Sequence, residues 1–561
     1  MAAEAFSDPE CASRLNADFV AIKVDREERP DIDQLLMNFL VETTGQGGWP
    51  LNVFMSADLK PFFAMTYAAL QARYGMPSFL DILSKVKDFF HEHENDLEPF
   101  ERFTRSIPSR SVKLPVVGKD LVDEEAQKFR GLDSAVSAKA DTLNGGVRGS
   151  QKFPPHTALL YAVHRLAVPG EETASAPLAL FVRSTLDAMA GRGLHDFVGG
   201  GFFRYCVDEQ WTIPHFEKML YDQALSLWNY SVAARLFSSS AYAAVAERTV
   251  AFLERDFVED GLFCAAIDAD TEHREGETYL WSMDELGPVL GEKMTEELSS
   301  VFDLSAKGNF EGKNHLVTKS GFAESPALQE VLARLLEIRR SRKQPFKDRK
   351  KLTSWNCLAG IALLQASRHL GHSGARELAE KQADAVLSVL YRGGEVSHGF
   401  LDGRHLGGRF LADYAALLLL LTYHHEDRRI FATEIDGLRK RLLDFRRDGI
   451  WMEGWEKDFL PVPAEDWDRP FPASAALAET ALCRAAMVRG EAYESVESGS
   501  GMMSDWRNFA AYASSGEWLL VTGPQPLPWN ALPICAAQGE GNQAQYCRRG
   551  TCTLGVPSIH S

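Results

Sequence analysis

Apolar residues recur at helical spacing from residue 119 to residue 490, with short strand-like pieces only in the loops between the periodic segments. The periodicity predicts helices over residues 158–167, 178–190, 216–237, 241–257, 327–343, 358–370, 376–391, 410–424 and 473–489. Helical pairs that recur at a spacing of about 50 residues are typical of an α/α toroid, and an irregular α-solenoid is the alternative.

The stretch Gly191–Asn229 organises this region, because a glycine triplet and an aromatic hairpin-like piece lead through Ile213-Pro214 into a predicted helix. At 100° per residue, one face of that helix carries four polar residues: His215, Lys218, Asp222 and Asn229. The opposite face carries the residues that we expect to face the core: Leu220, Ala224, Leu227 and Ser231. The polar face is either a cavity wall or a surface in contact with water.

A toroid whose inner helices run in one direction has all their N-termini at one mouth. Polar residues stand at several predicted helix starts, after Lys152-Phe-Pro-Pro155, at His215, at Ser354-Trp-Asn356 and at Asp413. Helix N-termini favour anions and hydroxyl groups through their free N–H groups. The second region is therefore predicted to carry a ligand site at this mouth.

Residues 1–105 have a different pattern, which predicts helix, strand, helix, Gly-Trp-Pro, strand, turn and strand in that order. The first strand is expected at Phe19–Val24, and Pro50 precedes the next one. This order is that of a thioredoxin fold, in which the proline at this place is usually cis. We predict an α+β multidomain chain with a truncated thioredoxin-like domain over 1–105 and a linker over 106–118. The predicted chain continues with a mainly α toroid over 119–490. It ends in an irregular tail over 491–561 that contains a short strand at 518–522.

Composition excludes several classes of protein. The charged fraction of 25% and the hydrophobic fraction of 45% are ordinary for a globular chain, and the net charge of −18 argues against nucleic-acid or anionic-membrane partners. The N-terminus lacks the features of a signal peptide, and the longest apolar run, 415–421, is too short to span a bilayer. We therefore expect a soluble, cytoplasmic protein.

Motifs for common cofactors and catalytic frameworks are absent from the sequence. It contains no CxxC, GxxxxGK[ST], HExxH or GxSxG, and no GxGxxG opens a βαβ unit. Eight cysteines are too few for a disulfide framework in 561 residues, and the close pair Cys547 and Cys552 is a weak metal or redox signal. No cofactor and no metal ion is expected.

Three motifs of the first region, VDREERPDID, TGQGGWPLNVF and KPFFAMTYAAL, resemble the thioredoxin-like domain of the spermatogenesis-associated-protein-20-like family, also known as DUF255. The second region carries further motifs of that family, LHDFVGGGFFRYCVDEQWTIPHFEKMLYDQA, FCAAIDADTEHREGETYLW, GNFEGKNHL and PFKDRKKLTSWN, with FLADYA as a fainter match. The resemblance implies a six-hairpin-glycosidase-like (α/α)6 toroid, similar to that of N-acylglucosamine 2-epimerases and cellobiose epimerases.

The sequence departs from the family at four places. The family has a Cys-His-Trp-Cys-His segment just before the first helix, and Met1 falls about where that segment ends, so we expect this polypeptide to lack thiol–disulfide oxidoreductase activity. Arg349 stands where the family has a second aspartate, and Cys357 where it has a glycine. DRPFPASAA replaces a Pro-Ser-Gly-Asn-Ser run near Asp468.

Candidate residues follow from the chemistry of sugar epimerisation, which needs a base, an acid and a donor to the enolate oxygen. The candidate catalytic residues are His215, His195, Glu217, Lys218, Asp268 and Asp270. The candidate substrate-binding residues are Arg204, Trp211, Asp222, Trp355, Asn356 and Asp413. For each histidine a structural role is the alternative, and the paired carboxylates Asp268 and Asp270 could instead serve glycoside hydrolysis, cation binding or hairpin capping.

Two functional hypotheses remain from the sequence. The first is a toroid that binds and modifies a small carbohydrate, as an epimerase or isomerase, beside a redox-inactive thioredoxin-like domain. The alternative is a non-catalytic scaffold or redox-linked accessory protein. The sequence identifies no protein partner.

Overall fold

The computed structural model describes residues 1, 4–73, 75–93, 103, 122–167, 176–321, 325–465, 467–489, 491, 505–507 and 509, and the strands of the tail. The chain divides into two compact units. The first contains Met1–Leu114, Gly407–Leu411 and Phe445–Ala464, and the second contains the rest. The predicted linker 106–118 lies outside the described residues.

Among its described residues, the first unit has three main helices and a β-hairpin, which follow the predicted order except for the strand expected between the first two helices. These are α1 (Pro9–Asp18), α2 (Pro30–Thr44), β1 (Asn52–Met55), β2 (Pro61–Met65) and α3 (Phe79–Glu92), preceded by η1 (Ala5–Ser7). Asp8 caps α1 by accepting N–H bonds from Glu10 and Cys11, and Ser78 and Asp81 form a capping box on α3. The Trp49–Pro50 bond is cis, as the sequence predicts. A second hairpin, β17 (Arg446–Arg447) and β18 (Ile450–Trp451), also belongs to this unit.

The strand predicted at Phe19–Val24 is wrong, because this segment has no regular secondary structure. The antiparallel hairpin of β1 and β2 forms a sheet of two strands, and neither strand pairs with the segment. Val20 and Ile22 are 88% and 77% exposed. An alternating apolar pattern forms a strand only where another strand supplies hydrogen bonds, and within the described residues none does so here.

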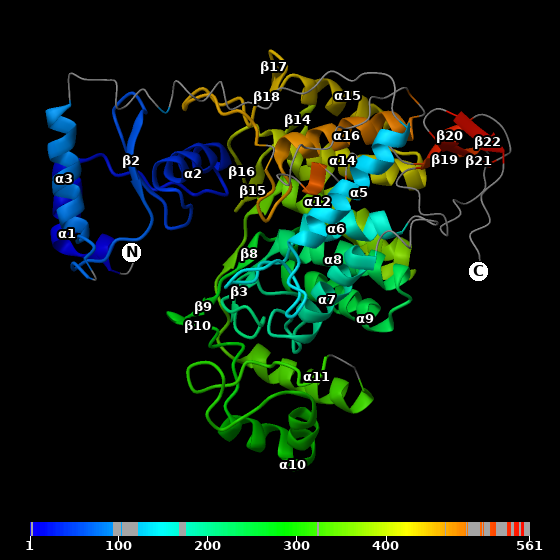
Figure 1. Cartoon of the computed structure of the whole chain (residues 1–561), viewed down its shortest axis with the longest axis horizontal. Coiled ribbons are helices and arrows are strands. Elements are labelled where there is room, and N and C mark those ends of the chain that lie inside the picture. The colour runs from blue at the N-terminus through cyan, green and yellow to red at the C-terminus, as the bar shows by residue number, and fades with distance from the viewer. Residues whose placement is uncertain are drawn as a thin grey trace. The chain divides into compact units, whose positions relative to one another are not determined.

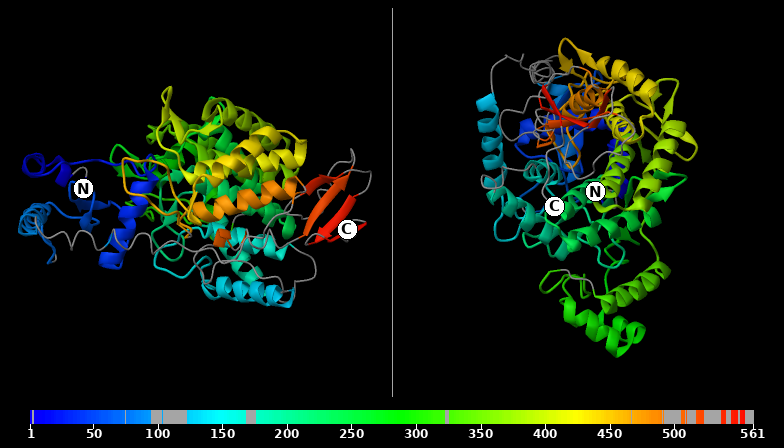
Figure 2. Two further views of the ribbon diagram at one scale, coloured as in Figure 1. Left: turned by 90° about the horizontal axis from the view of Figure 1, so that it is seen from above. Right: turned by 90° about the vertical axis from the view of Figure 1, so that its right-hand side faces the viewer.

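The second unit is a ring of paired helices, which the right-hand view of Figure 2 shows along its axis. Its helices are α5 (Val122–Ala138), α6 (His156–Leu166), α7 (Ala176–Gly191), α8 (Leu220–Leu236), α9 (Ser240–Phe252), α12 (Thr353–Leu370), α13 (Ser373–Ala385), α14 (Leu411–Arg428), α15 (Ala432–Leu443) and α16 (Ser474–Val488). Two short π-helical segments, Leu253–Phe257 and Val386–Leu390, extend α9 and α13. The expected fold class, an α+β chain with a mainly α toroid, is confirmed.

The inner helices α8 and α12 are buried nearly all round. Every residue from Leu220 to Ala234 is buried, and so is every residue of Cys357–Ala366. A helix that is covered on all sides must be packed within a protein core, which explains why one-sided amphipathicity is weak here. Outer helices such as α13 keep polar faces towards water.

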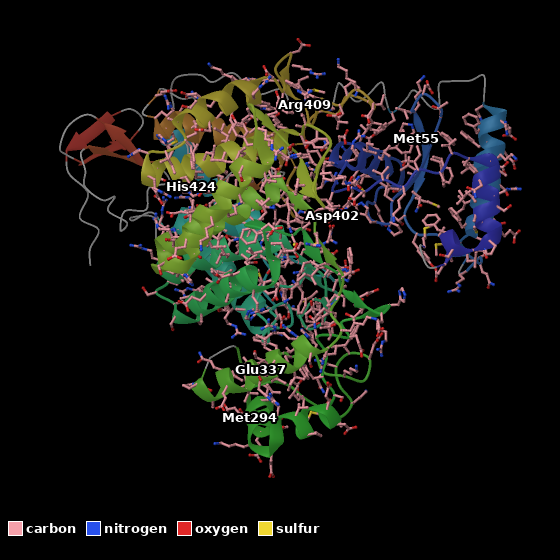
Figure 3. The ribbon with its side chains drawn as sticks, turned by 180° about the vertical axis from the view of Figure 1, so that it is seen from behind. Met55, Met294, Glu337, Asp402, Arg409 and His424 are labelled. Atoms are coloured by element: carbon pink, nitrogen blue, oxygen red, sulfur yellow. The ribbon has the colours of Figure 1, made fainter. Side chains whose placement is uncertain are left out.

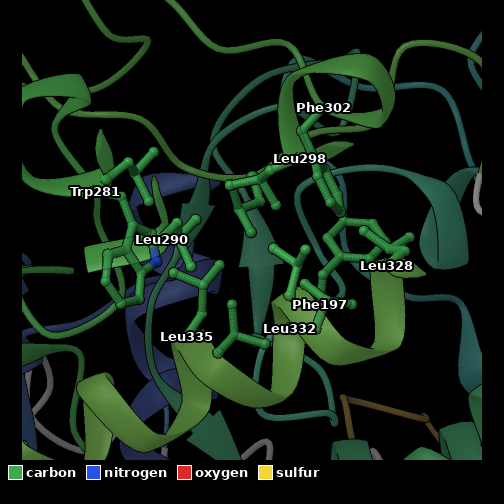
Figure 4. Close-up of a cluster of buried hydrophobic side chains, with 12 residues drawn as sticks. Phe197, Trp281, Leu290, Leu298, Phe302, Leu328, Leu332 and Leu335 are labelled. Atoms are coloured by element: carbon green, nitrogen blue, oxygen red, sulfur yellow. The ribbon is translucent and has the colours of Figure 1, made fainter. Parts of the chain in front are cut away.

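A helical pair is inserted between α9 and α12 and stands off the ring (Figure 1). It consists of α10 (Met283–Val301) and α11 (Pro326–Ser341), on which Figure 3 labels Met294 and Glu337. Its core is a cluster of apolar side chains that includes Trp281, Leu290, Leu298, Phe302, Leu328, Leu332 and Leu335 (Figure 4). Phe197 from the glycine loop joins the same cluster, so the insertion packs on the segment that precedes β3.

Short strands occupy the loops between the helices of the second unit. They are β3 (Tyr205–Cys206), β4 (Pro214–His215), β5 (Lys218–Met219), β6 (Val258–Glu259), β7 (Leu262–Phe263), β8 (Ala266–Ile267), β9 (Asp270–Thr271), β10 (Arg274–Glu275), β11 (Lys347–Asp348), β12 (Lys351–Leu352), β13 (Tyr391–Arg392), β14 (Glu395–Val396), β15 (Gly399–Leu401) and β16 (Arg404–Leu406). In the tail, β19 (Glu517–Thr522) lies between β20 (Ala536–Gly539) and β21 (Ala544–Arg548), and β22 (Thr551–Leu554) pairs with β21.

The helix predicted to begin at His215 begins five residues later, at Leu220. His215 lies in β4, which pairs antiparallel with β3, and Lys218 lies in β5, which pairs with β8. These backbone hydrogen bonds hold residues 214–219 extended. The predicted polar face therefore does not exist as one helix face.

A buried ion cluster joins the glycine loop to β5 and α11. The carboxylate of Asp196 lies 2.6 Å from Nζ of Lys218 and 2.8 Å from Nη1 of Arg339, and it accepts N–H bonds from Val198 and Gly199. All three charged side chains are at least 93% buried. Burial opposes the ionised form, but Arg339 and Lys218 lower the pKa of Asp196 well below its ordinary value, so it is charged.

The glycine triplet permits this packing. Gly200 has φ of 80°, and a Cβ there would lie 2.6 Å from the carbonyl oxygen of Arg248. A Cβ on Gly199 would overlap the guanidinium of Arg339. Larger residues would therefore push the loop away from both α9 and α11.

We predict that Asp196→Asn lowers the free energy of unfolding of the helical unit by about 3–5 kcal/mol, because two buried cations lose their counter-charge. Denaturant unfolding followed by circular dichroism measures the change. Glu337→Gln on α11 is the matched control, because its partner Arg334 is half exposed, and it should cost less than about 1 kcal/mol. Equal losses in both variants would contradict a structural role for the cluster.

Candidate functional site

The first turns of four inner helices lie in contact with one another. Nε2 of His156, the first residue of α6, lies 3.1 Å from Oδ1 of Asp222 in the first turn of α8. The rings of Tyr221 on α8 and Trp355 on α12 pack edge to face at 4.8 Å. The N–H of Ser354 on α12 donates to Asp413 of α14. The helix starts therefore form one polar mouth, as the sequence predicts for three of them.

His215 lies at this mouth between two carboxylates. Its Nδ1 is 2.6 Å from Oε1 of Glu275, and its Nε2 is 3.8 Å from Oε2 of Glu217. The hydrogen bond with His215 lowers the pKa of Glu275, so this carboxylate stays ionised and orients the imidazole. The side chain of His215 is 29% exposed, so a ligand can reach it.

An aromatic pair adjoins His215. The ring of Tyr205 lies 5.2 Å from the imidazole, and Phe153 stacks on Tyr205 at 4.5 Å. Phe153 is 47% exposed, although it is apolar. This pair presents a flat apolar surface beside an ionisable group.

Arg204 links the His215 cluster to the helix starts. Its Nη1 donates to Oε2 of Glu217 at 2.6 Å. Burial works against its charged form, but the neighbouring Tyr221, Glu217 and Asp222 raise the pKa of Arg204 above its ordinary value. A permanent positive charge therefore lies between Glu217 and Asp222, two of the predicted site residues.

Several buried polar atoms in this area have no hydrogen-bond partner within the described part of the chain. They are Nδ1 of His156, Oδ2 of Asp222, Oδ1 of Asn229 and Nε of Arg204. Most buried polar atoms in folded proteins do have partners. Two of them, Nδ1 of His156 and Oδ2 of Asp222, belong to the first turns of α6 and α8, where a site for a polar ligand would need hydrogen-bonding groups.

A pocket of about 240 Å³ opens at the start of α6. Its lining comes from three segments of the second unit, Pro154–Thr157, Trp467–Pro470 and Asp505, together with Lys139 of the α5–α6 connection. Asp468 accepts N–H bonds from Ala473 at 2.9 Å and from Trp506 at 2.8 Å, and so connects two of these segments. Burial, with a smaller effect of Asp505, raises the pKa of Asp468 to about 6.

Asp268 and Asp270 follow β8 next to the His215 cluster. The N–H of Asp270 donates to Oδ1 of Asp268 at 3.3 Å, so the two carboxylates share one turn. Burial, then Asp268 and Glu275, raise the pKa of Asp270, while His215 lowers it. The two carboxylates therefore belong to the same electrostatic cluster as His215.

Other predicted site residues lie in the core. His195 is fully buried between Phe197 and Phe202, and burial lowers its pKa to about 3. Lys218 is committed to Asp196. Neither side chain contacts the His215 cluster. Both are buried in the core, where their contacts are structural.

Three predicted binding residues also make structural contacts. Trp211 is fully buried, and its indole N–H donates to the carbonyl of Gly145. Asn356 forms hydrogen bonds with both backbone polar groups of Phe263. Asp413 accepts from Ser354 with one oxygen and lies 2.7 Å from Nδ1 of His398 with the other. The polar groups of these three side chains therefore have partners within the protein.

Sequence reasoning missed His156, Tyr205, Glu275 and Trp467. The Pro-Pro pair before His156 was a helix-start signal, but nothing local indicated that the imidazole meets Asp222. Glu275 comes from a loop 60 residues away from its partner His215. Such pairings depend on the ring and not on local pattern.

Among the described residues, no group of three or more histidine, cysteine, aspartate or glutamate side chains is arranged to hold a metal ion. None of the helices in the described ranges combines the length and apolar composition needed to cross a bilayer.

Comparisons with known proteins agree with the predicted resemblance. Residues 1–107 match a family model described as Thioredox_DsbH, protein of unknown function, DUF255. Spermatogenesis-associated protein 20 of Homo sapiens is 31% identical over 72% of this chain and 58% of its own length. An uncharacterized protein of Caenorhabditis elegans is 30% identical over 71% of this chain and 59% of its own. The chain thus spans less than two thirds of these relatives, and the resemblance predicted from the motifs is confirmed.

Two solved structures align with this chain at low sequence identity. A sugar epimerase from a ruminal bacterium shares 13% identity and covers 65% of this chain and 100% of its own, with a TM-score of 0.32. A D-mannose isomerase shares 12% identity and covers 66% of this chain and 83% of its own, with a TM-score of 0.40.

We predict that Asp468 makes stability depend on pH. Its folded pKa of about 6 lies above the ordinary value of 3.8, so its contribution is complete below pH 3.8 and is lost as the pH rises through 6. Relative to Asp468→Asn, the melting temperature of the wild type should therefore fall between about pH 4 and pH 7. Differential scanning fluorimetry measures both, with the exposed Asp303→Asn as control. A constant difference across this range would refute the prediction.

Proposed function

Starting from a chain related to spermatogenesis-associated protein 20, we propose that the helical ring binds a carbohydrate and catalyses proton transfer next to its carbonyl group, as an epimerase or isomerase does. His215 is the acid–base residue. Glu275 orients it, and Glu217 and Arg204 complete the charged surroundings.

The observation that carries the proposal is the geometry of His215. A histidine with Nδ1 hydrogen-bonded to a carboxylate at 2.6 Å keeps Nε2 available for proton exchange, and this side chain is reachable from solvent. The second carboxylate, Glu217, lies 3.8 Å from Nε2 and can stabilise the imidazolium after it takes a proton. An imidazole nitrogen can both take up and release a proton, as abstraction and return of a C–H proton require.

The surroundings fit a sugar. The exposed Phe153 on Tyr205 offers an apolar face for the C–H groups of a ring. Arg204 supplies a fixed positive charge where an enolate oxygen would need stabilisation. The unpartnered polar atoms of His156, Asp222 and Asn229 offer bonds to hydroxyl groups.

The chemistry requires one proton to leave the carbon next to the carbonyl and one to return. Abstraction places the electron pair on the carbonyl oxygen as an enolate, and reprotonation on carbon closes the cycle without any oxidant or reductant. Return of the proton to the opposite face of the same carbon gives epimerisation. In isomerisation the hydroxyl proton on that carbon passes to the former carbonyl oxygen, and the returning proton goes to the former carbonyl carbon, so that the carbonyl group moves to its neighbour.

We predict that His215→Gln lowers the rate of proton exchange by at least about 100-fold, because the acid–base group is lost while the size is kept. Wash-in of deuterium from D2O next to the carbonyl, followed by NMR, measures exchange on a panel of reducing hexoses, disaccharides and N-acylated hexosamines. His405→Gln changes a histidine bonded to Ser397 outside the cluster and should leave exchange unchanged. A wild type that exchanges no sugar of the panel would sink the proposal.

A further inference from the structure

The pocket at the start of α6 is separate from the His215 cluster but adjoins it. Phe153, which stacks above Tyr205 next to His215, is followed directly by Pro154 and Pro155, which line the pocket. A carbohydrate that extends from His215 past Phe153 would therefore reach the pocket.

The size of the pocket limits its ligand. Its volume of about 240 Å³ corresponds to roughly eight water molecules, and it is smaller than the roughly 300 Å³ at which pockets for drug-sized ligands begin. One six-membered sugar ring with its hydroxyl groups is small enough for a pocket of this volume. A nucleotide or a long acyl chain does not.

The charges that line the pocket are balanced. Asp468 and Asp505 contribute two carboxylates, while Lys139 and Arg469 contribute two cations. Nζ of Lys139 lies 3.7 Å from Asp505, and Arg469 forms two hydrogen bonds with Glu465, so both cations are held in place. Alternating donors and acceptors without a net charge suit hydroxyl groups, each of which both donates and accepts. An acidic ligand would meet the carboxylates and gain no net attraction.

Two residues that line the pocket, Trp467 and His156, indicate which groups a ligand would present to them. Trp467 is 56% exposed and offers a flat apolar surface to the C–H face of a ring. His156 lines the pocket with 97% of its surface buried, and within the described residues its Nδ1 has no hydrogen-bond partner. A buried histidine that lines a pocket while one of its ring nitrogens has no partner among the described residues indicates that the pocket binds a polar group.

We propose that this pocket binds one neutral hexose unit of the carbohydrate, stacked on Trp467 and hydrogen-bonded to His156, and that it discriminates against acidic sugars. The inference rests on the proposed function and extends it, because it assigns the substrate to neutral carbohydrates. The pocket binds without reacting, since the acid–base group lies at His215.

Methyl β-D-glucopyranoside tests the pocket alone, because it has no free carbonyl and cannot undergo the proposed proton transfer. Isothermal titration calorimetry on the full chain should detect binding with equal affinity to the wild type and to His215→Gln. Trp467→Ala should weaken it by about tenfold, whereas Trp467→Phe, which keeps an aromatic face, should retain most of the affinity. The methyl glucuronide should bind at least about tenfold more weakly than the glucoside.

Trp49→Ala is the matched control, since Trp49 is a 46% exposed tryptophan of the first unit and does not line the pocket. The inference is overturned by no binding of the glucoside, by unchanged affinity of Trp467→Ala, or by equal affinity for the glucuronide. Sugar exchange that requires His215 would in those cases still support the proposed function. Binding that requires Trp467, without exchange on any sugar, would support the pocket and count against the acid–base role.

Discussion

The buried charge of Asp196 is the constraint on which the second unit depends. Lys218 and Arg339 both pair with this carboxylate in the core. The loop can pack closely around the ion cluster because Gly199 and Gly200 have no side chain. The chain from Pro214 to Met219, which contains Lys218, is held extended by pairing with β3 and β8, and α8 begins only at Leu220. The extended path presents His215 and Glu217 at the mouth of the ring, where a helix would have turned them to different faces. Strand pairing beside the structural ion cluster thus determines where the candidate chemistry lies.

The sequence predicts the helices of the ring well, because the helical spacing of apolar residues is a local signal that can be read without knowing the fold. Helix starts near residues 353 and 411 were indicated by polar residues, and α12 and α14 begin there. The two errors have a common physical origin. In both segments the structure depends on whether a distant strand is available for pairing. The segment of His215 pairs with β3 and β8 and stays extended, whereas the segment of Phe19 has no partner strand among the described residues and forms no strand.

The candidate site was predictable in part. His215, Glu217, Arg204 and Asp222 were selected from one stretch of sequence, and the structure brings them into one network. Burial separates His195 from them, and burial depends on how Phe197 and Phe202 pack. The partners Glu275 and His156 arrive from other loops, so only the three-dimensional ring reveals them.

The contact between Lys139 and Asp505 has a consequence for assembly. These residues come from the two ends of the ring, and both line the pocket at α6. The pocket therefore needs contact between segments that are far apart in the sequence. A ligand that binds this pocket in the folded ring, but not in the unfolded chain, would stabilise the closed ring by mass action. Ligand binding at this pocket and contact between the two ends of the ring are therefore thermodynamically linked.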